Sequence, residues 1–73
     1  MIAVRMFSRE HWEHALRELG CQPLEGLGPL NTAEWWRAPW SFVFTVPIEG
    51  PEDRVGEREL GELVEMIGSR RPN

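Results

Sequence analysis

Two histidines are the residues whose type and spacing could bind a metal ion. His11 and His14 lie three positions apart in a segment predicted to be helical, with Glu10 and Glu18 nearby. Two imidazoles at this spacing can share a metal, but a closed zinc site needs four ligands, and Cys21 is the obvious addition. His14 falls nearly opposite the apolar side of the segment, and His11 flanks it. We therefore expect a solvated and a boundary histidine and no cofactor, with a metal-binding regulator as an alternative.

Three tryptophans within six residues form a second group, Trp35, Trp36 and Trp40. Successive strand residues point to opposite faces, so Trp35 and Trp36 cannot both enter one small core. An outward tryptophan is typical of an interface hot spot. It could also stack on an unpaired base while Arg37 contacts phosphate, or cover the flank of the sheet as a cation–π partner of Arg37. These alternatives make Trp35, Trp36, Arg37 and Trp40 the predicted interface or binding residues.

Two further motifs are weaker candidates for a functional site. Cys21 has no paired histidine and no second cysteine, so a buried structural thiol is expected. Gly26 and Gly28 form a G-x-G, but Pro29 follows and no helix or lysine comes after it, which argues against a phosphate loop.

The charge is acidic and unevenly distributed. The net charge is −4, all eight positive residues are arginines, and seven acidic residues lie between Glu49 and Glu65 against two arginines. Nucleic-acid-binding proteins usually present a basic face, because phosphate contacts supply much of their affinity. The acidity therefore disfavours RNA as a partner, and the acidic face of the second helix (Glu59, Glu62, Glu65) is expected to be solvated or to meet a basic partner.

Composition is that of one small globular domain. The 73 residues are 41% hydrophobic and 27% charged, which is too apolar for a disordered chain. One cysteine cannot form an internal disulfide, so a reducing, cytoplasmic location is predicted. We expect neither a signal peptide nor a membrane segment, since the longest strongly apolar run, 42–46, is far shorter than a membrane helix requires.

Hydrophobic periodicity predicts a helix, then antiparallel strands, then a second helix. The segment 8–19 is predicted to be helical, with Ser8 as its N-cap and Gly20 as its stop. Apolar residues recur there at helical spacing: Trp12, Ala15, Leu16 and Leu19. The second helix is predicted over 56–67, with Gly68 as its stop, and has its own stripe of Leu60, Leu63, Val64 and Ile67.

Between the helices, alternation predicts strands at 33–37 and 42–46, joined by a turn at 38–41, and a short strand near 22–25. The fold class is therefore α+β, a single domain over 1–73 with both helices on one face of a small sheet. The core is expected over 7–68, with 1–5 and 69–73 peripheral.

This layout resembles the HicA-type toxins, small ribonucleases of toxin–antitoxin pairs with a fold like the double-stranded-RNA-binding domain. The matching pieces are L-R-E-L-G at 16–20, W-R-A-P at 36–39, F-T-V-P at 44–47 and the closing helix at 60–68. The resemblance spans about residues 6–68 and implies RNA cleavage, with an antitoxin as protein partner.

The resemblance also locates the family's active site. Its histidine stands in a Gly-Ser-His triplet before the R-x-P turn, and that triplet corresponds to Asn31-Thr32-Ala33 here. Ala33 cannot transfer a proton, as a histidine could. Thr32 and Glu34 are the nearest alternatives, as a positioning hydroxyl and a general base, although loop capping and strand solvation are the simpler explanation of both.

The sequence thus predicts a non-catalytic, HicA-like interaction module that forms a homo-oligomer or binds a cognate protein. The alternative is an RNA-targeting toxin with altered catalytic residues.

Overall fold

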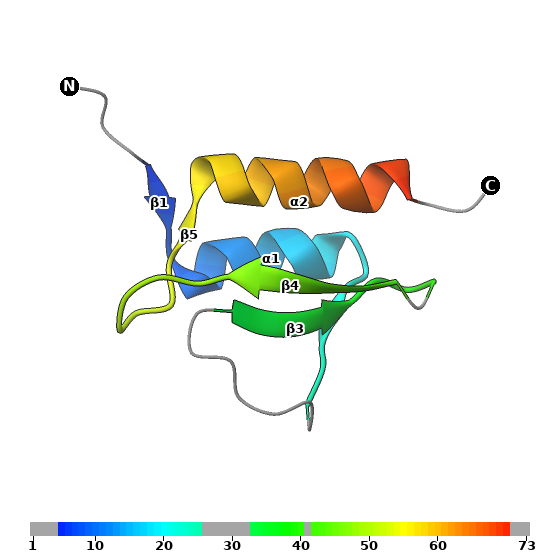
Figure 1. Cartoon of the computed structure of the whole chain (residues 1–73), viewed down its shortest axis with the longest axis horizontal. Helices are drawn as coiled ribbons and strands as arrows, with labels where there is room; N and C mark the ends of the chain where they lie inside the picture. Colours follow the sequence, from blue (N-terminus) through cyan, green and yellow to red (C-terminus); the bar gives the residue numbers. More distant parts are fainter. Residues whose placement is uncertain (1–4, 26–32, 41, 71–73) are drawn as a thin grey trace.

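Two helices and five short strands are found in the computed structural model, which describes residues 5–25, 33–40 and 42–70. The elements follow in the order β1 (Met6–Phe7), α1 (Arg9–Glu18), β2 (Gln22–Pro23), β3 (Ala33–Arg37), β4 (Val43–Pro47), β5 (Val55–Gly56) and α2 (Glu57–Ser69) (Figure 1). The result is a small α+β domain with a few antiparallel strands, as the sequence predicted.

The main sheet is antiparallel, with strand order β2-β3-β4. Trp36 pairs with Phe44, and Glu34 pairs with Val46, so these four side chains share one face. The predicted β3 has the observed bounds, and β2 is shorter than predicted. Beyond β2, the Leu24 N–H donates to the Trp35 carbonyl at 2.9 Å and extends the pairing by one bond.

The second strand of the hairpin is displaced by one residue from its predicted range, since β4 includes Pro47 and begins at Val43. Proline usually ends a strand because it lacks an N–H. Pro47 pairs with Ala33, a position at which the backbone nitrogen points away from β3. The ladder therefore loses no hydrogen bond at Pro47, and the strand continues through this residue.

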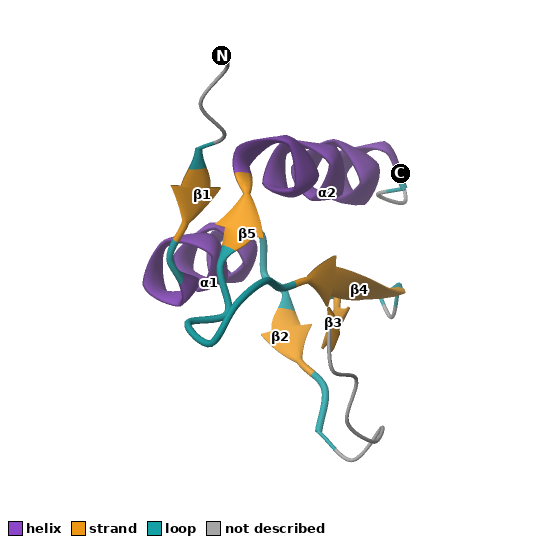
Figure 2. Ribbon diagram, turned by 60° about the vertical axis from the view of Figure 1, so that its left-hand side comes forward, coloured by secondary structure: helices purple, strands orange, loops and turns teal. Residues whose placement is uncertain are grey.

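Both helices lie on the same side of β3 and β4, as Figures 1 and 2 show. One core lies between these layers. It contains Trp12 and Leu16 from α1, the sheet residues Trp36, Phe44 and Val46, and Leu60, Leu63 and Ile67 from α2, with Cys21, Ala38 and Val55 from other segments. Leu19 and Val64, predicted members of the apolar stripes, are each 39% exposed and lie at the margin of the core.

The predicted N-cap and the predicted stop of the first helix are both confirmed. Ser8 is the N-cap of α1, and its hydroxyl accepts from the His11 backbone N–H. Gly20 has φ +84°, and a Cβ there would lie 2.7 Å from Pro39 Cγ. The glycine therefore serves two purposes, because it takes a left-handed backbone conformation and lets the 38–40 turn approach closely.

The end of the second helix differs from the prediction. Gly68 lies inside α2, which continues to Ser69 with Arg70 as its C-cap. The Ser69 hydroxyl donates to the Met66 carbonyl at 3.0 Å, and the Arg70 N–H reaches the same carbonyl at 3.1 Å. These bonds complete the last turn, so glycine is not needed to terminate it.

The structure contains a two-stranded ladder that the sequence did not predict. β1 pairs antiparallel with β5, with Met6 opposite Gly56 and Phe7 opposite Val55. The Glu57 N–H also donates to the Arg5 carbonyl at 2.9 Å. Each strand immediately precedes a helix, so the ladder joins the beginnings of α1 and α2, which then run in the same direction (Figure 1).

Candidate functional site

The β3–β4 hairpin places the adjacent tryptophans on opposite faces of the sheet. Trp36 is fully buried, whereas Trp35 is only partly buried and belongs to the face turned away from the helices. Its cross-strand partner Thr45 is exposed, as are the paired residues Arg37 and Val43, the latter 42% exposed. We call these four residues the outer patch; they are contiguous, and none of them is needed to complete the core.

Trp36 is a core residue, which corrects its predicted place in a binding surface. Its ring packs edge-to-face on Trp12, with centroids 5.7 Å apart and an interplanar angle of 66°. The Arg17 guanidinium of α1 lies 5.5 Å from the centroid of Trp36. The cation over this buried tryptophan thus comes from α1.

Trp40 lies in the turn after β3 and is partly buried against the core. It lines a shallow groove of about 340 Å³ between the ends of the two helices, together with Leu19, Pro39 and Ile67. Its Nε1 is buried and finds no hydrogen-bond partner in the part of the chain that the structure describes. This residue is therefore separate from the outer patch.

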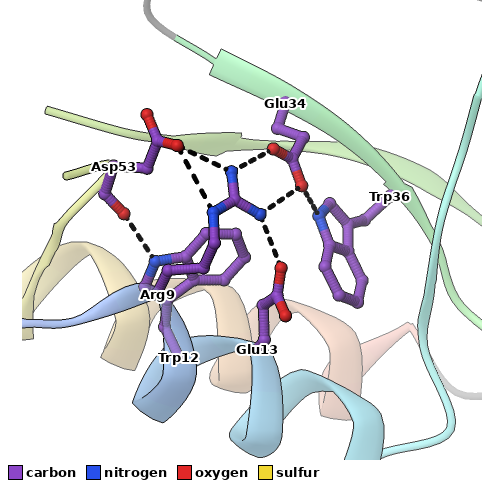
Figure 3. A network of polar contacts seen from close by, with 6 residues as sticks. All are labelled: Arg9, Trp12, Glu13, Glu34, Trp36 and Asp53. Atoms are coloured by element: carbon purple, nitrogen blue, oxygen red, sulfur yellow. Dashed lines mark hydrogen bonds and ion pairs between the residues drawn. The ribbon is translucent and has the colours of Figure 1, made fainter. Parts of the chain in front are cut away.

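A polar cluster around Arg9 joins α1, β3 and the loop before β5 (Figure 3). Arg9 Nη2 lies 2.5 Å from Glu34 Oε2 and 3.1 Å from Asp53 Oδ2, and Nη1 lies 2.5 Å from Glu13 Oε1 and 3.2 Å from Glu34 Oε1. One guanidinium thus contacts three carboxylates, whose side chains are 27–39% exposed. One positive and three negative groups give the cluster a formal charge of −2.

Two indole groups extend this cluster into the core. Trp36 Nε1 donates to Glu34 Oε1 at 2.9 Å, and Trp12 Nε1 donates to the Asp53 backbone carbonyl at 2.8 Å. Arg9 also lies over the Trp12 ring, 4.9 Å from its centroid. Asp53 adopts φ +53°, a left-handed conformation in the turn after Gly50. Both buried tryptophans are therefore held by the same polar cluster.

The electrostatics of the cluster favour its charged form. The hydrogen bonds from Arg9 are the main cause of the lowered pKa of Glu34; burial opposes this shift, and the Trp36 N–H adds to it. The pKa of Arg9 is raised, chiefly by its hydrogen bonds to Glu34, against the opposing effect of burial. A carboxylate with a lowered pKa and donors on both oxygens is a poor proton acceptor. The geometry therefore argues against the predicted general-base role of Glu34.

Of the other predicted catalytic positions, only Ala33 lies within the described residues. Ala33 opens β3 opposite Pro47, with a methyl group where the HicA resemblance expects histidine. Thr32 and Asn31 lie outside the described residues, as do Gly26 and Gly28.

The histidines occupy the exposed side of α1. His11 Nδ1 lies 2.9 Å from the Ser8 hydroxyl, and His14 Nε2 lies 3.5 Å from Glu18. Both residues are exposed, so His11 is not the boundary residue that the sequence predicted. Within residues 5–25, 33–40 and 42–70, no three histidine, cysteine, aspartate or glutamate side chains are grouped so that they could hold a metal ion.

Cys21 is buried, as predicted, and its burial raises the pKa of the thiol. The neutral thiol is therefore favoured and packs as a small apolar group.

Comparisons with protein-family models, curated proteins and solved structures find no match to this chain. Among the described residues, neither helix has the length and apolar character needed to cross a membrane.

Sequence reasoning missed the Arg9 cluster. Arg9 and Glu13 have the i, i+4 spacing of a helical ion pair, which is a usable signal. Glu34 shares a strand face with Trp36, so a buried Trp36 implies an inward carboxylate that needs a partner. Asp53 gives no such signal, because its place depends on the fold of the loop.

Proposed function

We propose that this chain is a non-catalytic protein-interaction module on a HicA-like scaffold, and that its outer patch binds a second copy of the chain. The observation that carries the proposal is the different environment of two adjacent tryptophans. Trp36 completes the core, while Trp35 remains on the open face of the sheet beside an exposed valine. A large aromatic side chain in that position is typical of an interface hot spot.

The composition of the outer patch fits an isologous contact. Trp35 and Val43 supply apolar area, Thr45 can donate and accept hydrogen bonds, and Arg37 provides a polar rim. In a two-fold dimer the same residues contribute from both sides, so a small patch is used twice. A domain of this size also gains stability from association, because its own core is small.

The HicA-like scaffold is supported by the element order. A helix, three antiparallel strands and a second helix follow in the order that the resemblance implies, and W-R-A-P falls at the β3–β4 turn. On that alignment Ala33 occupies the histidine position and supplies no proton-transfer group. The neighbouring Glu34 belongs to a cluster with excess negative charge, which would repel an RNA phosphate. These two features favour binding over RNA cleavage.

Sedimentation velocity across a range of protein concentrations tests the proposal. The wild-type chain should show a concentration-dependent mass, and Trp35→Ser should shift the association to higher concentration while the circular dichroism spectrum is retained. Leu19→Ser is the matched control, because it removes an exposed apolar side chain at the C-cap of α1, outside the outer patch. A monomer at every concentration, or equal effects of both variants, would reject self-association through this patch.

A further inference from the structure

Among the strands that the structure describes, β4 is an edge strand of the three-stranded sheet, and the backbone groups on its outer side pair with none of the others. The Ala38 N–H donates to the Phe42 carbonyl at 2.8 Å. This bond makes Ala38 and Phe42 a hydrogen-bonded pair, and such pairs recur at every second residue of an antiparallel ladder. Phe44 and Val46 therefore direct their backbone groups toward β3. Val43 and Thr45 therefore point both N–H and C=O outward. Such an edge can accept another strand.

A groove runs along this edge, between β4 and α2. Its volume is about 410 Å³, and its apolar floor includes Phe44, Leu63 and Met66. Thr45 and Pro47 line the strand side of the groove. An added strand would therefore gain side-chain contacts with α2 in addition to backbone hydrogen bonds.

The helix side of the groove is acidic. Glu59 and Glu62 both line it. Glu62 is paired with Arg58 at 3.3 Å, but both side chains are largely exposed, and such pairs are weak and readily exchanged. Among the described residues, no basic side chain lines the groove, although the Arg70 guanidinium lies 5.1 Å from the ring centroid of Phe42, which does line it. The charge on the helix side, at Glu59 and Glu62, is complementary to a cationic occupant.

We propose that this groove binds an extended segment of a partner protein, in which basic residues alternate with β-branched residues, as a fourth strand beside β4. The basic side chains face α2, where their alkyl stems cover Leu63 and Met66 and their charged ends reach Glu59 and Glu62. The β-branched side chains lie on the opposite face, next to Val43 and Thr45, where cross-strand contacts favour them.

The charge of the groove argues against two other occupants. If two copies paired through β4 in antiparallel fashion, their α2 helices would lie on the same face of the joined sheet, with Glu59 and Glu62 of each copy facing those of the other. Like charges brought together in this way are unfavourable. A nucleic acid would bring its phosphates to the same two carboxylates.

This proposal shares with the proposed function the premise that the chain binds protein. The two surfaces meet at Val43 and Thr45, but the groove extends to α2, whereas the outer patch extends to Trp35 and Arg37. The probe is a capped heptapeptide of alternating valine and lysine, titrated into the full chain labelled with ¹⁵N. We expect saturable binding, with amide shifts concentrated at Val43, Thr45 and residues 59–66. Glu59→Gln combined with Glu62→Gln should weaken binding roughly three- to tenfold. Glu65→Gln, on the same helix but outside the groove, should not change it.

Two changes to the peptide test the proposal without altering the protein, so their effects on binding do not depend on whether a protein variant folds. Replacing every lysine with glutamate should abolish saturable binding. Methylating the two backbone nitrogens that face β4 should weaken binding roughly tenfold or more, because each removes a hydrogen-bond donor. Absence of saturation by the valine–lysine peptide, or affinity unchanged by methylation, would overturn the proposal. So would shifts confined to Trp35 and Arg37.

The Trp35→Ser variant separates the two proposals. It should bind the peptide as the wild type does, although its self-association is weakened. Peptide binding by a chain that remains monomeric would support strand binding in the groove and reject self-association through the outer patch. Self-association without peptide binding would support the outer patch and reject strand binding in the groove.

Discussion

Arg9 in the first turn of α1 and Glu34 in β3 face each other in a two-point contact, with both carboxylate oxygens within hydrogen-bond distance of the guanidinium. They are 25 residues apart in sequence. Because Glu34 also accepts from Trp36, the contact connects a surface ion pair to a fully buried aromatic ring. It orients the first helix on the sheet as well as contributing charge attraction.

Glu34→Gln should lower the free energy of unfolding by about 1 kcal/mol, because it keeps the shape of the side chain but removes its charge, and charge-assisted hydrogen bonds are worth more than neutral ones. The loss is modest because these side chains are about one-third exposed and solvent screens their attraction. Urea denaturation provides the measurement. Glu62→Gln is the control, since it breaks only the exposed pair with Arg58. It should cost roughly half as much or less. Equal losses in the two variants would contradict the importance of the Arg9 cluster.

The same contact should make stability depend on pH. The pKa of Glu34 is lowered in the folded chain, mainly by Arg9. Its contribution is therefore fully present above the ordinary glutamate pKa of about 4.3, and it is lost as pH falls through the lower folded pKa. The stability difference between wild type and Glu34→Gln should shrink as the pH falls below about 4. Urea titrations at several pH values measure this difference, and a gap that stays constant or widens in acid would contradict the assignment.

The sequence predicted well those features that depend on local periodicity. Trp12 and Leu16 recur at helical spacing and are buried in α1, and Phe44 and Val46 alternate with exposed neighbours in β4. These patterns follow from side-chain geometry within one element.

What the sequence left open depends on contacts between elements. The choice between Trp35 and Trp36 required knowing which face of the sheet the helices cover. β1 and β5 have two residues each, too few for any periodicity. Asp53 reaches Arg9 only because the loop after β4 turns back toward α1.

Two glycines should respond oppositely to replacement by alanine. Gly20 takes a left-handed backbone conformation, and an added methyl would contact Pro39. Gly20→Ala should therefore destabilise the chain by about 1 kcal/mol or more. Gly61 lies within α2 with open space where the Cβ would be, so Gly61→Ala should stabilise the chain by about 1 kcal/mol at most. Thermal and urea unfolding of the two variants provide the comparison. Destabilisation by Gly61→Ala would show that α2 does not tolerate a side chain there.

RNA cleavage in cells that express the chain decides between the interaction module and the altered toxin. We expect no cleavage and no growth arrest relative to an empty vector, since Ala33 supplies no proton-transfer group and Glu34 is held by Arg9 and Trp36. Ala33→His restores the group that the HicA alignment expects, and Ala33→Asn is its control of similar polarity without an imidazole. Cleavage by the histidine variant alone would support the alignment. Cleavage by the wild type would reject the non-catalytic proposal, and Glu34→Gln would then test whether this carboxylate carries the reaction.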